Sequence, residues 1–281
     1  MKFYSTNQKI KNVSLKSAIT SGLAADGGLL MPEMIPTLTS QELQSLKGKD
    51  FATIAKTVGY KFIQDDLPAD DFSKIVSKAF NFPLKLQAIQ NQITALELFH
   101  GPTLAFKDFG ARFLAGLLEY YLEKDQQKIT IVVATSGDTG GAVAQAFYQS
   151  KFVDVVLLFP SKKVSELQEK QLTTLGENIT ALEVLGTFDD CQRMVKQALG
   201  DVGLQKQRAL TSANSINIAR FIPQSFYYFY AWSQYQDQAP DIFCVPSGNF
   251  GNLAAGLLAK KMGLPINKFI AATNLNRTFP D

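Results

Sequence analysis

The sequence predicts an α/β protein built on parallel sheets, and three observations support this. From residue 129 onward, short apolar runs alternate with longer segments of helical periodicity. The runs at 129–134 and 153–159 are apolar throughout, which is typical of strands that helices cover on both faces. Glycine-rich loops at 135–141 and 247–252 follow apolar runs, at the end of a parallel strand where ligands bind.

Composition excludes several classes of protein. The 281 residues are 46% hydrophobic and 19% charged, which is ordinary for a globular chain with a sizeable core. A net charge of +3 without a basic run predicts no nucleic-acid partner. The apolar runs are too short to span a membrane, so we expect no membrane partner. Residues 1–10 resemble no signal segment and there are only two cysteines, so we expect a cytoplasmic protein. With His100 as the single histidine, we expect no metal site and no Ser-His-Asp triad.

The first 93 residues are predicted to be mostly helical. Helical periods occur at 40–46, 51–63 and 69–80, after a loop at 24–37 that glycines and prolines punctuate. A short apolar run at 93–98 predicts a strand.

The remainder alternates strands and helices. Strands are expected at 129–134, 153–159, 179–185, 209–212, 241–245 and 269–273, and helices at 139–149, 164–175, 189–199, 218–235 and 252–262. We predict a small α/β domain at 129–205 and a larger, incomplete domain formed by 94–128 together with 206–281.

A lysine within segment 99–113 is the first candidate catalytic residue. Lys107 lies between an apolar approach and an amphipathic helix for which Asp108 is a suitable N-cap. A helix N-terminus and aromatic neighbours both disfavour an ammonium, so they lower the lysine pKa, as a Schiff-base lysine requires. The alternative is a lysine whose stem packs on the helix and whose ammonium is solvated.

The loop at 135–141 is suited to a carboxylate. It contains Thr135, Ser136, Gly137, Asp138 and Thr139 at the predicted junction of a strand and a helix. Free amides and hydroxyl donors there attract an anion, and Asp138 could accept a hydrogen bond from a ligand hydroxyl. The alternative is a simple turn that Asp138 caps.

The loop at 247–252 is suited to a phosphate. Its residues Gly248, Asn249, Phe250, Gly251 and Asn252 include no lysine, but amides at a helix start can hold a phosphate without cations. The alternative is a tight turn. Neither loop matches the dinucleotide pattern Gly-x-Gly-x-x-Gly.

A third loop could hold a second anion. Asn214, Ser215 and Arg220 follow a predicted strand, and an arginine is the natural bidentate partner of a phosphate or carboxylate. The alternative is that Asn217 caps a helix and Arg220 is solvated. A ligand that offers an aldehyde to Lys107 and a phosphate to 247–252 is pyridoxal 5′-phosphate.

With these segments the sequence resembles the threonine synthases, which belong to the tryptophan-synthase-β-like fold type (fold type II) of pyridoxal phosphate enzymes. The resemblance covers essentially the whole chain and is carried by segments 100–113, 134–141, 214–224 and 246–252. It implies two three-layer domains with parallel sheets, the larger one binding the cofactor, and a mostly helical N-terminal region. Members of the family continue well past residue 281, and the partner of the cofactor ring nitrogen is expected in that later part.

The resemblance also implies roles for individual residues. Lys107 would bond to the cofactor aldehyde, residues 248–252 would hold its phosphate, and Asp138 would lie beside its ring. The substrate would contact Thr135, Ser136, Gly137, Thr139, Asn214, Ser215 and Arg220. The implied reaction is that of a lyase acting on phosphates, which converts O-phospho-L-homoserine and water to L-threonine and phosphate, in a monomer or homodimer.

Three alternatives remain at this point. Serine/threonine dehydratases and β-replacement synthases share the fold type. A catalytically incomplete protein that binds phosphorylated ligands is the alternative from another class. A nucleotide-binding α/β protein is the third, and the absent Gly-x-Gly-x-x-Gly pattern argues against it.

Overall fold

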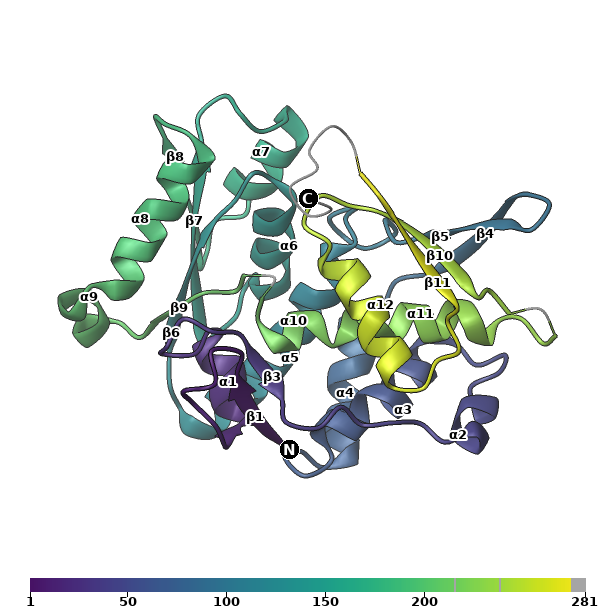
Figure 1. Cartoon of the computed structure of the whole chain (residues 1–281). Helices are drawn as coiled ribbons and strands as arrows, with labels where there is room; N and C mark the ends of the chain where they lie inside the picture. Colours follow the sequence, from purple (N-terminus) through teal and green to yellow (C-terminus); the bar gives the residue numbers. More distant parts are fainter. Residues whose placement is uncertain (215, 238, 274–281) are drawn as a thin grey trace.

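A four-stranded parallel sheet with the strand order β8-β7-β6-β9 organises the middle of the chain. The computed structural model describes residues 1–214, 216–237 and 239–273. The strands of this sheet are β6 (Ile129–Ala134), β7 (Val153–Pro160), β8 (Ile179–Val184) and β9 (Leu210–Thr211). Helices α6 (Asp138–Phe147) and α7 (Glu166–Thr173) lie on one side of it and α8 (Phe188–Gly200) on the other (Figure 1).

Strands β6 and β7 in the middle of this sheet are largely buried on both faces, which explains why they are apolar at successive positions. Ile131 and Val133 belong to the main core, whereas Val132 packs with Cys191 and Val195 of α8 in a second, smaller cluster. The prediction of an α/β protein with helix-covered parallel strands is thereby confirmed.

A second parallel pair lies elsewhere in the chain. Strand β10 (Ile242–Pro246) pairs with β11 (Lys268–Ala272), and α12 (Gly251–Lys261) connects them. Beneath them runs α11 (Pro223–Ser233), whose Tyr228 ring lies 5.1 Å from the Phe243 ring and 6.1 Å from the Phe269 ring. The predicted division into a domain at 129–205 and a larger one at 94–128 and 206–281 stays a prediction. Strand β9 falls in the predicted larger domain, but it pairs with β6 of the smaller one.

The remaining elements are the long helix α5 (Lys107–Asp125), an N-terminal region, a hairpin and two short helices. The N-terminal region contains α1 (Leu15–Ser21), α2 (Ser40–Ser45), α3 (Phe51–Ile63), α4 (Ala69–Ala79) and an antiparallel sheet of β1 (Lys2–Ser5), β2 (Val13–Ser14) and β3 (Leu30–Pro32). An antiparallel hairpin of β4 (Lys85–Gln90) and β5 (Ile93–Glu97) projects beyond this core (Figure 1). The short helices α9 (Val202–Gln207) and α10 (Ile218–Phe221) flank β9.

One predicted helix is two helices in the structure. The segment 218–235 is divided into α10 and α11 at Ile222, where Pro223 begins the second helix. A proline is favoured at the first position of a helix because its missing N–H removes no hydrogen bond there.

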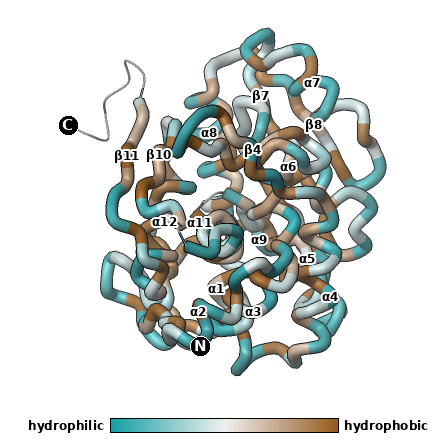
Figure 2. Tube along the Cα trace, turned by 90° about the vertical axis from the view of Figure 1, so that its right-hand side faces the viewer, coloured by the Kyte–Doolittle hydropathy of each residue, from teal (hydrophilic) through white to brown (hydrophobic). Residues whose placement is uncertain are grey.

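Hydrophobic and hydrophilic stretches alternate along the trace (Figure 2). Among the described residues, no helix combines the length and the apolar character needed to cross a bilayer.

Candidate active site

Lys107 is the first residue of α5, which begins two residues earlier than the predicted cap at Asp108 implies. Its side chain is half-buried, and its Nζ lies 4.6 Å from the centre of the Phe106 ring. Burial lowers the pKa of the Lys107 ammonium, the nearby Asp138 carboxylate raises it, and the Arg220 guanidinium lowers it further. The interactions with Asp138 and Arg220 show that three predicted site residues share one electrostatic environment.

Asp108 is not the N-cap that we predicted. It is the second residue of α5, is fully buried, and accepts hydrogen bonds from the Thr103 amide (2.9 Å) and hydroxyl (2.7 Å). Burial raises the pKa of the Asp108 carboxyl despite these bonds. The carboxylate turns back to the turn before the helix, where a Cβ on Gly101 would stand 2.4 Å from Asp108 Oδ2. Asp108 therefore fixes the approach to Lys107 and does not cap the helix.

Loop 135–141 is organised by Thr135. Its buried Oγ1 accepts hydrogen bonds from the Gly137 amide (3.0 Å) and the Gly140 amide (2.8 Å). This leaves Thr135 engaged within the loop, while Ser136 and Asp138 are exposed and Thr139 is half-buried. Gly137 has φ +135°, a backbone conformation that favours glycine.

The loop at 247–252 joins β10 to α12 and leaves space over its backbone. Phe250 is the left-handed N-cap of α12, and its amide donates to Ser247 Oγ (3.1 Å). A Cβ on Gly248 or on Gly251 would meet nothing within 4 Å, and neither has a positive φ. Packing in the described residues does not require these glycines, so the open backbone at a helix start fits a phosphate.

A chain of aromatic contacts connects the start of α5 to the start of α12. The Phe109 ring lies 5.5 Å from Tyr227, and the Tyr227 ring lies 5.1 Å from Tyr228. The Tyr228 hydroxyl donates to the Asn252 carbonyl at 2.7 Å. The lysine helix and the helix behind the phosphate-suited loop are therefore linked through α11.

The residues of the third predicted anion loop, 214–220, have different surroundings in the structure. Asn217 is buried and caps α10, accepting from the Ala219 amide and donating to the Ile19 carbonyl, which was our alternative interpretation. Asn214 is exposed, and Ser215 lies outside the described residues. Arg220, by contrast, is not solvated.

Arg220 is a buried cation. Only 1% of it is exposed; its Nη1 donates to the Ala213 carbonyl at 2.6 Å, and its Nε has no hydrogen-bond partner in the described part of the chain. Burial lowers the pKa of its guanidinium to about 10, with no carboxylate opposing the shift. Because an unpaired buried charge is costly, this geometry favours an anionic ligand.

Sequence reasoning did not identify Gln168, whose Nε2 donates to Asp138 Oδ1 at 2.7 Å. The available signal was the pair Ser165 and Gln168, which has the spacing of a capping box and forms one at the start of α7. It also did not single out Tyr228, since an aromatic run gives no indication of which hydroxyl finds a partner.

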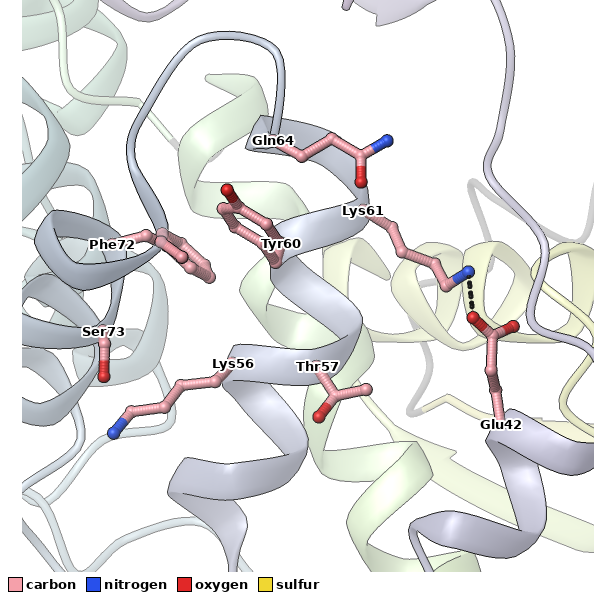
Figure 3. Close-up of a pocket in the computed structure, with 9 residues that line it drawn as sticks. Glu42, Lys56, Thr57, Tyr60, Lys61, Gln64, Phe72 and Ser73 are labelled. Carbon is pink, nitrogen blue, oxygen red and sulfur yellow. Dashed lines mark ion pairs between the residues drawn. The ribbon is translucent and has the colours of Figure 1, made fainter.

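One cavity, of about 390 Å³, is lined by none of these residues. It lies among α2, α3 and α4, and Figure 3 shows Lys56 and Lys61 at its rim and the ion pair of Lys61 with Glu42 (2.7 Å). A second cavity of about 260 Å³ lies among the turn at 102–103, α6 and α7, with Thr103, Gly141 and Gln171 in its wall. In the ranges that the structure covers, no group of three or more His, Cys, Asp or Glu side chains could hold a metal ion.

Two family profiles match the chain in succession. Residues 2–80 match the family described as "Threonine synthase N terminus", and residues 82–279 match the family described as "Pyridoxal-phosphate dependent enzyme".

Individual relatives agree with both matches. Threonine synthase from Buchnera aphidicola subsp. Baizongia pistaciae is 47% identical over 283 residues, which is 100% of this chain and 66% of the relative. Threonine synthase from Escherichia coli is 45% identical over 100% of this chain and 65% of its own length. The chain thus spans about two thirds of the length of these curated relatives.

Solved structures show the same likeness in three dimensions. The crystal structure of Escherichia coli threonine synthase superposes with a TM-score of 0.92 at 44% identity, over 100% of this chain and 65% of that one. PLP-bound threonine synthase from Brucella melitensis gives a TM-score of 0.91 at 41% identity, over 98% of this chain and 61% of that one.

Proposed function

The chain belongs to the family of pyridoxal-phosphate-dependent enzymes and has the N-terminal region found in threonine synthases, and we propose that its protein converts O-phospho-L-homoserine and water to L-threonine and phosphate. The observation that carries this proposal is the buried Arg220 guanidinium, which forms no ion pair among the described residues and acts electrostatically on Lys107. The open backbone at 247–252 suits the phosphate of the cofactor, so a second anion-suited position argues for a substrate that carries its own phosphate.

The residues present fit the cofactor. Residues 248–252 would hold its phosphate on main-chain amides, and Lys107 would bond to its aldehyde. Asp138 would lie beside its ring. When bound, pyridoxal phosphate supplies a conjugated ring that accepts electron density from the substrate Cα.

Lys107 supplies the base. Because burial and Arg220 disfavour its ammonium, its amine is available to take the proton from the substrate Cα. The Asp138 carboxylate opposes this effect, so its position sets how basic the amine is.

The loop at 135–141 would receive the amino-acid carboxylate. Ser136, Thr139 and the amides at the start of α6 are its donors, and Thr135 and Gly137 give the loop its shape. Arg220 would hold the γ-phosphate of the substrate until it leaves, with Asn214 and Ser215 as further predicted contacts. A proton leaves Cβ as the phosphate departs, water then adds its hydroxyl at Cβ, and protons returned to Cα and Cγ complete threonine.

We also propose the two-domain arrangement of fold type II, with the sheet β8-β7-β6-β9 in the smaller domain. A monomer or a homodimer would be compatible with it.

The test offers phosphohomoserine, serine and threonine separately to the purified holoenzyme. Formation of threonine with equal release of phosphate supports the proposal; release of ammonia from serine or threonine without that reaction contradicts it. Arg220→Ala should raise KM for phosphohomoserine at least tenfold, about 1.4 kcal/mol, and leave cofactor affinity little changed. Arg208→Ala, at an exposed arginine that pairs with Asp154, is the matched control and should leave KM unchanged.

A further inference from the structure

Gln168 makes contacts with two parts of the structure at once. Its Oε1 accepts from the Ser165 amide (3.2 Å) and hydroxyl (3.0 Å) and so closes the capping box of α7. Its Nε2 reaches across 30 residues of sequence to Asp138 Oδ1 at 2.7 Å. The side-chain oxygen of Gln168 is therefore held by Ser165, while its side-chain nitrogen donates to the Asp138 carboxylate.

The loop before α6 is shaped to admit this side chain. A Cβ on Gly137 would stand 2.3 to 2.6 Å from the amide atoms of Gln168, closer than a real Cβ approaches any neighbour. Gly137 also has φ +135°. Glycine at this position thus lets Gln168 lie directly over the loop and reach Asp138.

The bond decides which partner Asp138 has. Asp138 interacts electrostatically with Lys107, yet within the described residues its carboxylate is bonded to Gln168 and forms no ion pair with the lysine. The other charge that acts on Lys107 is Arg220, which is not a partner for an ammonium. A carboxylate released from Gln168 would be free to turn toward the Lys107 ammonium, on which it already acts electrostatically.

We propose that Gln168 is a positioning residue that holds the Asp138 carboxylate away from Lys107, so that the lysine amine stays free of an ion pair and nucleophilic. The importance of this for catalysis rests on the proposed function, but the claim about the amine does not.

The experiment measures how readily Lys107 itself reacts. The whole protein in its cofactor-free form is labelled with trace acetic anhydride from about pH 6 to about pH 11, and the acetylation of Lys107 is quantified by mass spectrometry. Gln168→Met removes both side-chain contacts without adding a charge. It should raise the labelling pKa of Lys107 by about one unit and lower its rate at pH 8 roughly tenfold.

Three controls separate positioning from structural damage. Ser165→Ala breaks the capping box but keeps the Gln168 donor, so the labelling curve of Lys107 should not move. Lys170 on the same helix is 65% exposed and should label identically in every variant. In an Asp138→Asn background, Gln168→Met should no longer change Lys107, because no carboxylate remains to be released.

A wild-type labelling curve in Gln168→Met overturns the proposal. So does an equal shift in Ser165→Ala, which would assign the effect to α7 stability, or a shift that persists in the Asp138→Asn background. Because no cofactor or substrate is used, these outcomes do not depend on whether the protein is a threonine synthase.

Discussion

Gly110 lies against the backbone of Arg220. A Cβ on Gly110 would stand 2.7 Å from the Arg220 carbonyl oxygen and 3.3 Å from its Cα. Helices α5 and α10 therefore touch main chain to main chain, three residues after Lys107. This contact fixes the distance between the lysine and the buried guanidinium, which are 113 residues apart in sequence.

Gly110→Ala should therefore destabilise the protein and disturb the anion site. We expect a loss of about 1–3 kcal/mol in the free energy of unfolding, measured in denaturant, because a methyl group has no room at this crossing. Gly200→Ala is the control: its Cβ would meet nothing within 4 Å at the exposed end of α8, so it should be neutral or stabilise by up to about 1 kcal/mol. Equal effects of the two substitutions would contradict a close crossing.

Tyr228→Phe should weaken the phosphate-suited loop, whereas Tyr227→Phe should not. Tyr228 donates to the Asn252 carbonyl at the start of α12, and its loss should cost about 1 kcal/mol and lower cofactor affinity. The buried Tyr227 hydroxyl has no partner among the described residues, so removing it should be neutral or stabilising. Thermal unfolding with and without pyridoxal phosphate measures both; a cofactor-dependent loss confined to Tyr227→Phe would refute the assignment.

Thr135→Val should disorganise loop 135–141 without changing side-chain volume. It removes the acceptor of the Gly137 and Gly140 amides, so we expect a loss of about 1–3 kcal/mol and a raised KM for substrate. For the Thr139 hydroxyl the described chain shows no hydrogen bond, so Thr139→Val should preserve stability. A Thr139→Val variant that is the less stable of the two would reverse our account of the loop.

Replacing Lys107 by methionine should make the cofactor-free protein more stable, and the gain should depend on pH. Burial lowers the pKa of Lys107 in the folded state below its unfolded value, so the folded state binds fewer protons in the range between them. The cost of the buried ammonium is complete below the folded pKa and disappears as pH rises toward about 10.4. The advantage of Lys107→Met in urea unfolding should therefore be largest near neutral pH and shrink in alkaline buffer.

The matched control for this experiment is Lys74→Met on α4. Lys74 is 79% exposed, so its substitution should change stability little and equally at every pH. A gain that grows with pH in Lys107→Met would mean that the ammonium is stabilised in the folded state.

The sequence alone was sufficient for elements whose pattern is long and regular. The helix at 51–63 and the strand at 129–134 have the predicted bounds, because burial on one or both faces determines their composition. The strands Val13–Ser14 and Leu30–Pro32 were not predicted, since two or three residues carry no periodicity.

Within the candidate site, local pattern found Lys107 at a helix start but misjudged its neighbours. Asp108 has the composition of an N-cap, yet it is used by Thr103, five residues earlier. The burial of Arg220 and the bond from Gln168 to Asp138 depend on contacts between distant segments, which no single-sequence pattern contains.

Arg220 performs two tasks with one side chain, since Nη1 donates to the Ala213 carbonyl, two residues after β9, while Nε has no partner among the described residues. A lysine has its three donors on one compact ammonium and lacks the planar fork that separates Nη1 from Nε, and a hydrocarbon would be the better choice for folding alone. Random libraries at this codon should therefore diverge according to what is selected. Growth that requires the enzyme should recover arginine, whereas a screen for heat resistance alone should enrich methionine and leucine.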